Sequence, residues 1–400
     1  MKTHPKRRRR RFFALLIFIN LCITFFFPTT LIFTAADDAE TQAEEKLNES
    51  IYQLIDELDL AALEEYVNSL DDFSDTSVAE RLIAYIQGEE FDYANFGQKI
   101  LRVLFENVAK ILPAFACIAA ITLLSGVISS LRGGGTAKTS AEMIFLISYA
   151  AALIPLIGVL IECFEQSTSC IAEMQRQMQI VFPIMLTLMA ASGGTVSVAV
   201  CRPAVGFFST TIVSIISSVV FPLTITIIVF SMAGNLTSEL KISKFTAFFK
   251  SINKWIIGIC ISVFGLFFTL QGLTAATRDG IVRRATKYAI GNGIPIVGGF
   301  LSGGFDLAVA GSVLIKNSLG SMSIFMMVSI LFEPIVLLIA VNLLLRLTSA
   351  ITQPFGDSKI SDFLGETATN LQYCTAGLLF TAFMFFLSVL LLVSATEALF

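Results

Sequence analysis

The chain has 400 residues, of which 55% are hydrophobic and 14% charged, with 36 phenylalanines, a net charge of −4 and a mean hydropathy of +0.79. A soluble domain carries nearer a quarter charged residues. The recurring apolar runs are also long enough to cross about 30 Å of hydrocarbon. The composition therefore excludes an ordinary soluble protein. It predicts an all-α polytopic membrane protein, with six to eight membrane segments after a signal peptide.

The first 36 residues have the pattern of an export signal. A cluster of bases that ends at Arg11 precedes an apolar run over residues 12–33, and small residues follow up to Ala36. This order predicts a secretory signal peptide over residues 1–36. Because the apolar run is long for a signal peptide, an uncleaved anchor is the alternative. Either interpretation exports the residues that follow.

Residues 37–100 contain more than half of the 31 acidic residues in the chain. Apolar residues recur there at helical spacing over residues 47–58 and 78–86. We therefore expect an acidic, helical extracytoplasmic segment, with a partly disordered spacer as the alternative. The negative charge argues against nucleic acid as a partner.

Residues 101–400 are predicted to form a multi-pass membrane domain that contacts lipid. A basic, aromatic-faced stretch over residues 241–255 is expected to lie at the membrane surface. The predicted apolar segments, in chain order, are residues 111–131, 143–161, 180–200, 204–234, 255–276, 294–314, 318–345 and a closing helix at 373–392.

Short motifs recur in the same order in two parts of this domain, which predicts a tandem internal repeat of roughly 110 residues. The repeat units are expected at about 136–240 and 241–358. The paired motifs are FPI at 182–184 with IPI at 294–296, SGG at 192–194 with SGG at 302–304, VFP at 220–222 with FEP at 332–334, and KISKF at 241–245 with KISDF at 359–363.

The two SGG motifs make residues 180–200 and 294–314 candidates for Pro/Gly-broken segments. Gly193, Gly194, Gly303 and Gly304 are therefore candidate transport or structural residues, because secondary transporters build midplane sites from paired broken helices. The alternative is that these small residues only allow helices to approach closely. Whether the broken segments cross or re-enter the membrane stays open, because the basic loops on either side of residues 255–276 balance each other.

Glu333 is the clearest ionisable residue within an apolar run, and an acid there marks a site of transport or of structural pairing. Lys316, Arg346 and the backbone groups freed by Pro334 are its candidate partners. Asp306 is a weaker candidate of the same kind.

The residues of common catalytic centres are missing from the sequence. The only histidine is His4, in the predicted signal peptide, which removes histidine-based nucleophile pairs and metal sites. No phosphate-binding GxxxxGK[ST] motif is present, so any ATP-driven step must belong to a separate chain. We expect no catalytic, cofactor or metal site, and no enzyme.

Three stretches resemble the stage III sporulation protein AE family: ASGGTVSVA at 191–199, DGIVRRATKYAIGNGIPIVGG at 279–299 and LIKNSLG at 314–320. The resemblance covers essentially the whole chain. It implies a multi-pass protein of an endospore-forming bacterium, placed in the mother-cell membrane around the forespore.

The resemblance also implies partners and a function. The partners are the other stage III sporulation AA to AH proteins, including an ATPase, and stage II sporulation protein Q of the forespore. Together they would form a channel-like complex that supports forespore gene expression during engulfment. The alternative function, which the repeat suggests, is a stand-alone permease-like secondary transporter of a small solute.

Overall fold

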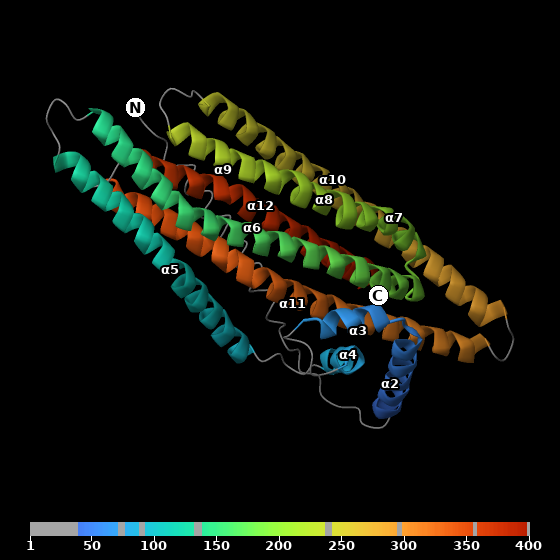
Figure 1. Cartoon of the computed structure of the whole chain (residues 1–400). Coiled ribbons are helices and arrows are strands. Elements are labelled where there is room, and N and C mark those ends of the chain that lie inside the picture. Colours follow the sequence, from blue (N-terminus) through green and yellow to red (C-terminus); the bar gives the residue numbers. More distant parts are fainter. Residues whose placement is uncertain are drawn as a thin grey trace, which may run out of the picture. The chain divides into compact units, whose positions relative to one another are not determined.

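The computed structural model describes residues 39–70, 77–87, 93–131, 138–236, 242–293, 298–354 and 358–397 (Figure 1). Nearly all of these residues are helical, and none of them forms a strand. The predicted signal peptide lies outside the described residues. The chain forms two units, residues 1–46 and 47–400. Only the start of helix α2 (Ala39–Glu57) is described in the first unit, and all the other described helices belong to the second.

Three helices precede the long ones: α2, α3 (Ala61–Asn68) and α4 (Val78–Ile86). Ser77 begins α4 with a capping box, because its hydroxyl accepts from the Glu80 amide at 3.2 Å and the Glu80 carboxylate accepts from the Ser77 amide at 3.3 Å. Apolar side chains of α3 and α4, Leu63, Val67 and Leu82 among them, are fully buried. This acidic segment is therefore packed as helices.

Six long helical stretches follow, and each is long and apolar enough to cross a membrane. The chain is thus an all-α polytopic membrane protein, as the composition predicts. The stretches are α5 (Tyr93–Leu131), α6 (Lys138–Ala191), the run from α7 (Thr195–Gly206) through η2 (Phe207–Ile212), α8 (Val213–Ile215) and η3 (Ile216–Val220) to α9 (Phe221–Leu236), α10 (Ser243–Gly293), α11 (Gly298–Thr352) and α12 (Ser358–Glu397).

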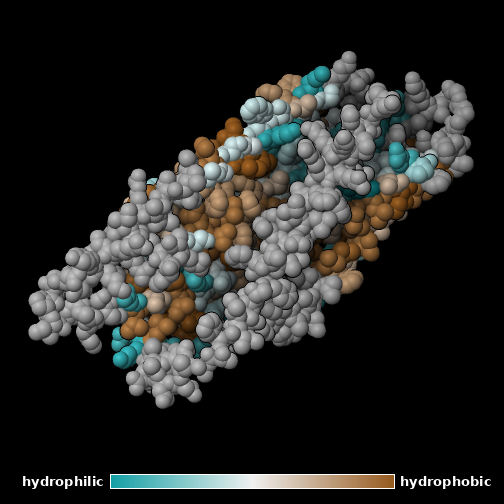
Figure 2. Space-filling model, turned by 180° about the vertical axis from the view of Figure 1, so that it is seen from behind, coloured by the Kyte–Doolittle hydropathy of each residue, from teal (hydrophilic) through white to brown (hydrophobic). Residues whose placement is uncertain are grey.

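Helices α11 and α12 form the centre of the bundle. α11 packs against α5, α6, α10 and α12, and α12 packs in addition against α6 and α9 (Figure 1). The most apolar part of α12 is 56% buried, against 22% for α10, which runs along the edge. Where described residues are visible from behind, much of their surface is apolar (Figure 2), as expected where lipid is the solvent.

Several predicted segment boundaries are wrong. The segments 143–161 and 180–200 lie largely in the single helix α6, and the segments 294–314 and 318–345 lie largely in the single helix α11. Residues 143–161 and 180–200 were expected on either side of a polar connector, but α6 runs unbroken from Lys138 to Ala191. The connector residues 162–179 are mostly good helix formers without glycine or proline. One of their faces, which includes Cys163, Met174 and Gln177, is buried.

The two SGG motifs are not equivalent in the fold. Residues 192–194 separate α6 from α7, whereas Gly303 and Gly304 lie inside α11. The expectation of a second broken segment at 302–304 is therefore wrong. In the second repeat unit α10 ends at Gly293 and α11 begins at Gly298, whereas Pro183 of the first repeat unit lies inside α6.

The KIS motifs both lie at helix starts but in different surroundings. Ser243 begins α10 and Ser358 begins α12. Phe363 of the second motif is 1% exposed, and Phe245 of the first is 63% exposed. This difference follows from position, since α12 is central and α10 is at the edge. The internal repeat remains a prediction from sequence.

Candidate functional site

The turn between α6 and α7 explains two of the predicted glycines. Gly193 has a φ of 91°, and its amide donates to the Ala190 carbonyl at 3.0 Å. The Gly194 amide donates to the Met189 carbonyl at 2.9 Å. These two bonds form a Schellman motif, which requires a left-handed residue where Gly193 lies. Gly193 and Gly194 therefore end α6 and reverse the chain.

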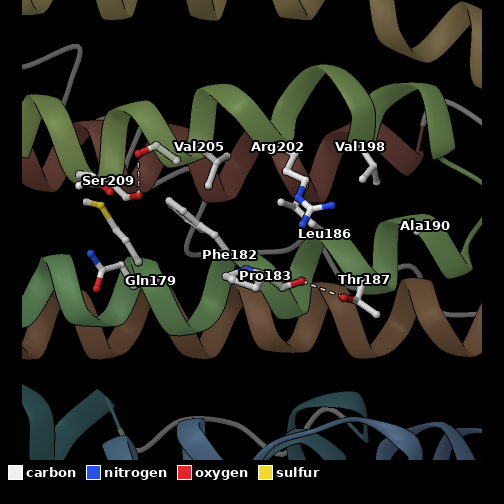
Figure 3. A pocket seen from close by; sticks show the side chains of 13 residues that line it. Gln179, Phe182, Pro183, Leu186, Thr187, Ala190, Val198, Arg202, Val205 and Ser209 are labelled. Carbon is white, nitrogen blue, oxygen red and sulfur yellow. Dashed lines mark hydrogen bonds between the residues drawn. The ribbon is translucent and has the colours of Figure 1, made fainter.

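The hairpin made by this turn encloses a cavity of about 680 Å³ between α6 and the α7–η2 run (Figure 3). This volume is within the range of about 300–1,000 Å³ of pockets that hold small molecules. Most of the wall is apolar. The polar lining residues are Gln179 and Thr187 of α6 and Arg202, Ser209 and Thr210 of the α7–η2 run.

Two of these hydroxyls are already bonded to their own helices. Thr187 donates to the Pro183 carbonyl at 3.0 Å, and Ser209 donates to the Gly206 carbonyl at 3.4 Å (Figure 3). Each such bond uses the single proton of the hydroxyl but leaves its oxygen able to accept another. The cavity therefore presents mainly an apolar wall, one guanidinium, one amide and the hydroxyl of Thr210.

Arg202 is the only charged side chain among the residues that line this cavity. Figure 3 shows it reaching from α7 toward α6, beside Leu186. Within the part of the chain that the structure describes, no ion pair joins Arg202 to another residue. It is exposed and lies near the start of the candidate span Thr195–Leu236, about 10 Å along the axis from Thr195. A long arginine side chain near the end of a membrane helix can reach the headgroup region, where water and anions are available to it.

A polar stripe on α6 leads from the middle of this helix to the cavity. The large apolar side chains that α6 exposes lie between Met143 and Ile161. Beyond Glu162 the exposed positions of α6 are polar or small: Glu165, Thr168, Ser169, Ala172, Arg176, Gln179, Pro183, Thr187, Ala190 and Ala191. Gln179, Pro183, Thr187 and Ala190 line the cavity. The exposed face of α6 is therefore apolar along its first half and more polar along its second.

Glu333 does not meet the partners expected from sequence. Lys316 is fully buried and donates to the Val393 carbonyl at 2.8 Å, while the Arg346 guanidinium donates to the Asn342 side-chain oxygen at 2.9 Å. Both bases share α11 with Glu333, and at 1.5 Å per residue they lie about 25 and 20 Å away along its axis. The prediction of these partners is wrong because they are too distant on one helix.

Glu333 is instead exposed, next to an ion pair that joins two other helices. Lys110 of α5 pairs with Glu162 of α6, and the Glu333 carboxylate lies within electrostatic range of Lys110. This charge cluster, Lys110 with Glu162 and Glu333, lies where the exposed face of α6 changes from apolar to polar.

The six predicted site residues are therefore not gathered in one place. Gly193 and Gly194 form the hairpin turn, and Asp306 is half-buried near the start of α11. Gly303 and Gly304 lie about 45 Å from Glu333 along the axis of α11. The described residues contain no group of three His, Cys, Asp or Glu side chains that is suited to hold a metal ion.

The acidic segment is anchored to the membrane body through α3 and α4. The Tyr66 hydroxyl of α3 donates to the Glu173 carbonyl of α6 at 3.3 Å, and burial raises the pKa of this phenol. Arg176 lies 5.3 Å from the centre of the Tyr66 ring and 3.8 Å from the Glu65 carboxylate. Gly311 of α11 leaves room for Leu54 of α2, since a Cβ there would lie 2.9 Å from its Cδ1.

Sequence reasoning missed Arg202, Lys110 and Glu162 as site residues. The sequence does single out Arg202, because it is the one charged residue in the apolar run of residues 180–236. Lys110 and Glu162 had none, because a charge near the end of an apolar run is ordinary. Only the packing of α5 on α6 brings these two together.

Comparison with known proteins agrees with the sequence resemblance. A family model described as stage III sporulation protein AE matches residues 77–396, which include α4 and all six candidate spans. A stage III sporulation protein AE of Bacillus subtilis (strain 168) is 24% identical over 315 residues, covering 78% of this chain and 79% of that protein. No solved structure matches the fold. The chain belongs to the stage III sporulation protein AE family.

Proposed function

We propose that this protein is a membrane subunit of the channel-like complex between mother cell and forespore, and that it supports forespore gene expression during engulfment. It would lie in the mother-cell membrane that surrounds the forespore. Its partners would be the other stage III sporulation AA to AH proteins and stage II sporulation protein Q. The observation that carries the proposal is the family match across the whole membrane body.

The docking of the acidic segment supports this role. If the segment is exported, as the signal peptide predicts, it occupies the space between the two membranes. Tyr66 and Val67 are fully buried, and the segment contacts both α6 and α11, so it is held in a defined orientation on the membrane body. A subunit that meets partners across a narrow space benefits from a fixed surface of this kind, because less ordering entropy is lost on binding.

The proposal gives the chain no catalytic step. Energy from ATP would enter through the ATPase of the complex, which is a separate chain. The relative's name describes a sporulation protein and names no reaction.

Co-purification from sporulating cells tests the proposal. A C-terminally tagged protein is extracted in mild detergent after brief cross-linking, next to an equally tagged, unrelated polytopic protein. We expect the ATPase, other stage III proteins and stage II protein Q to be enriched with the first protein and not with the second. Recovery of the tagged protein alone, at normal abundance, would contradict the proposal.

The second candidate, a stand-alone secondary transporter, is favoured by the cavity and by the polar stripe that leads to it. Uptake of a small solute by liposomes that contain only the purified protein would support this function. A result with partners recovered and no uptake by the isolated protein supports the complex.

A further inference from the structure

We propose that the cavity between α6 and α7 binds an anionic phospholipid, with Arg202 as the ligand of its phosphate group. The acyl chain would lie along the apolar wall formed by Phe182, Leu186 and Val205. This site is independent of the proposed function, since a complex subunit and a transporter both require a folded hairpin.

The charge of the cavity lining favours an anionic ligand. Arg202 is the only charged lining residue, and no ion pair joins it to another residue of the described ranges. A guanidinium presents parallel N–H donors that match the oxygens of a phosphate. Arg202 also lies about 10 Å from the start of its span, within reach of the headgroup region, and the lipid phosphate is the anion that every bilayer supplies there.

The mostly apolar lining of the cavity favours a lipid over a free anion. An inorganic phosphate is strongly hydrated and needs several donors, but most of this lining is apolar. Arg202, the Gln179 amide and the Thr210 hydroxyl are the principal donors, since Thr187 and Ser209 donate to their own backbones. An amphiphile uses both features, because its phosphate binds the arginine and its hydrocarbon covers the wall.

The surroundings of Arg202 indicate how a lipid would enter. Arg202 is exposed, and so are Pro183 and Ala190 on the facing wall of α6. The cavity is therefore open at the surface of the helix bundle, and a lipid can enter it from there.

Lipid titration of the purified full-length protein tests the site. Phosphatidylglycerol, phosphatidylcholine and inorganic phosphate are titrated separately, with native mass spectrometry and the shift in unfolding temperature as readouts. Arg202→Gln removes the charge and keeps a similar size. Arg346→Gln is the matched control, because Arg346 is an exposed arginine of α11 away from the cavity.

We expect phosphatidylglycerol to bind at least tenfold more tightly than phosphatidylcholine. Arg202→Gln should weaken phosphatidylglycerol binding about tenfold, and Arg346→Gln should leave it unchanged. Equal binding of both lipids, or equal loss in both variants, would overturn the proposal. So would stabilisation by inorganic phosphate alone, which would indicate a free-anion site.

A photoreactive phosphatidylglycerol keeps the proposal testable if Arg202→Gln does not fold. It is added to the wild-type protein, and the cross-linked peptides are identified. We expect labels within residues 178–190 and 198–210, reduced by excess unlabelled phosphatidylglycerol. Labels confined to other helices would refute the site.

Discussion

Gly320 lets the central pair of helices approach closely. A Cβ at residue 320 of α11 would lie 2.6 Å from Cγ2 of Val393 on α12, and 3.5 Å from Cγ1 of Val389. Ordinary carbon contacts lie at about 3.5–4.0 Å, so an added methyl group must displace Val393 by about 1 Å. Val393 is β-branched and its backbone carbonyl accepts from Lys316, so it has little freedom to move.

The expected cost follows from two opposing effects. Overpacking a core costs about 1–3 kcal/mol, and replacing a helical glycine with alanine gains about 1 kcal/mol. Gly320→Ala should therefore lower the free energy of unfolding by about 0–2 kcal/mol, and Gly320→Val by more. At Gly158 of α6 a Cβ would meet nothing within 4 Å. Gly158→Ala and Gly158→Val thus supply controls for helix propensity alone.

Buried thiols give a direct assay for unfolding in detergent. Cys163, Cys170, Cys201, Cys260 and Cys374 are buried and react with a thiol dye only after unfolding. Cys117, which is exposed, and Cys22, which lies outside the described residues, are first replaced by alanine. The unfolding temperature of Gly320→Val should fall well below that of Gly158→Val. Adding Val393→Ala should recover part of the loss. Equal temperatures for the two glycine variants would refute the close approach of α11 and α12.

Three other predictions concern contacts between helices. Tyr66→Phe removes one hydrogen bond and should lower the free energy of unfolding by about 0.5–1.5 kcal/mol. Tyr66→Ala should lower it by about 3–5 kcal/mol and expose the acidic segment to limited proteolysis. Asn253→Ala should cost about 0.6–2 kcal/mol in the thiol assay, because its amide donates to a threonine hydroxyl of α9 at 2.9 Å. Glu162→Gln should lower the free energy of unfolding by at most about 1 kcal/mol, because Glu162 forms the ion pair of the partly exposed charge cluster. Glu333→Gln should lower it by less, and a larger effect for Glu333→Gln would contradict this arrangement.

The fold class was predictable because hydropathy reports directly on burial in lipid. Apolar runs long enough to span the bilayer are a property of composition, and six described stretches meet it. The helix boundaries were less predictable. A charged stretch such as residues 162–179 is read from hydropathy as a connector, although one buried face and helix-forming residues are enough to continue α6.

The candidate site was harder to predict than the fold, because it depends on which segments become neighbours. Leu186 and Arg202 face each other only because Gly193 reverses the chain between them. Lys110 and Glu162 meet only because α5 packs on α6. The pairing of Glu333 was predicted wrongly because Lys316 and Arg346, about 25 and 20 Å away along the axis of α11, lie at different depths.

The asymmetry between the two SGG motifs predicts opposite effects of one substitution. Gly193 has a φ of 91°, where an L-residue is strained, so Gly193→Ala should cost about 1–2 kcal/mol. Gly303 lies inside α11, where alanine is favoured over glycine by about 1 kcal/mol. In the thiol assay the unfolding temperature should therefore fall for Gly193→Ala and stay level or rise for Gly303→Ala. A similar fall in both variants would mean that both motifs break a helix, and the duplicated pair of broken segments expected from the sequence would then be restored.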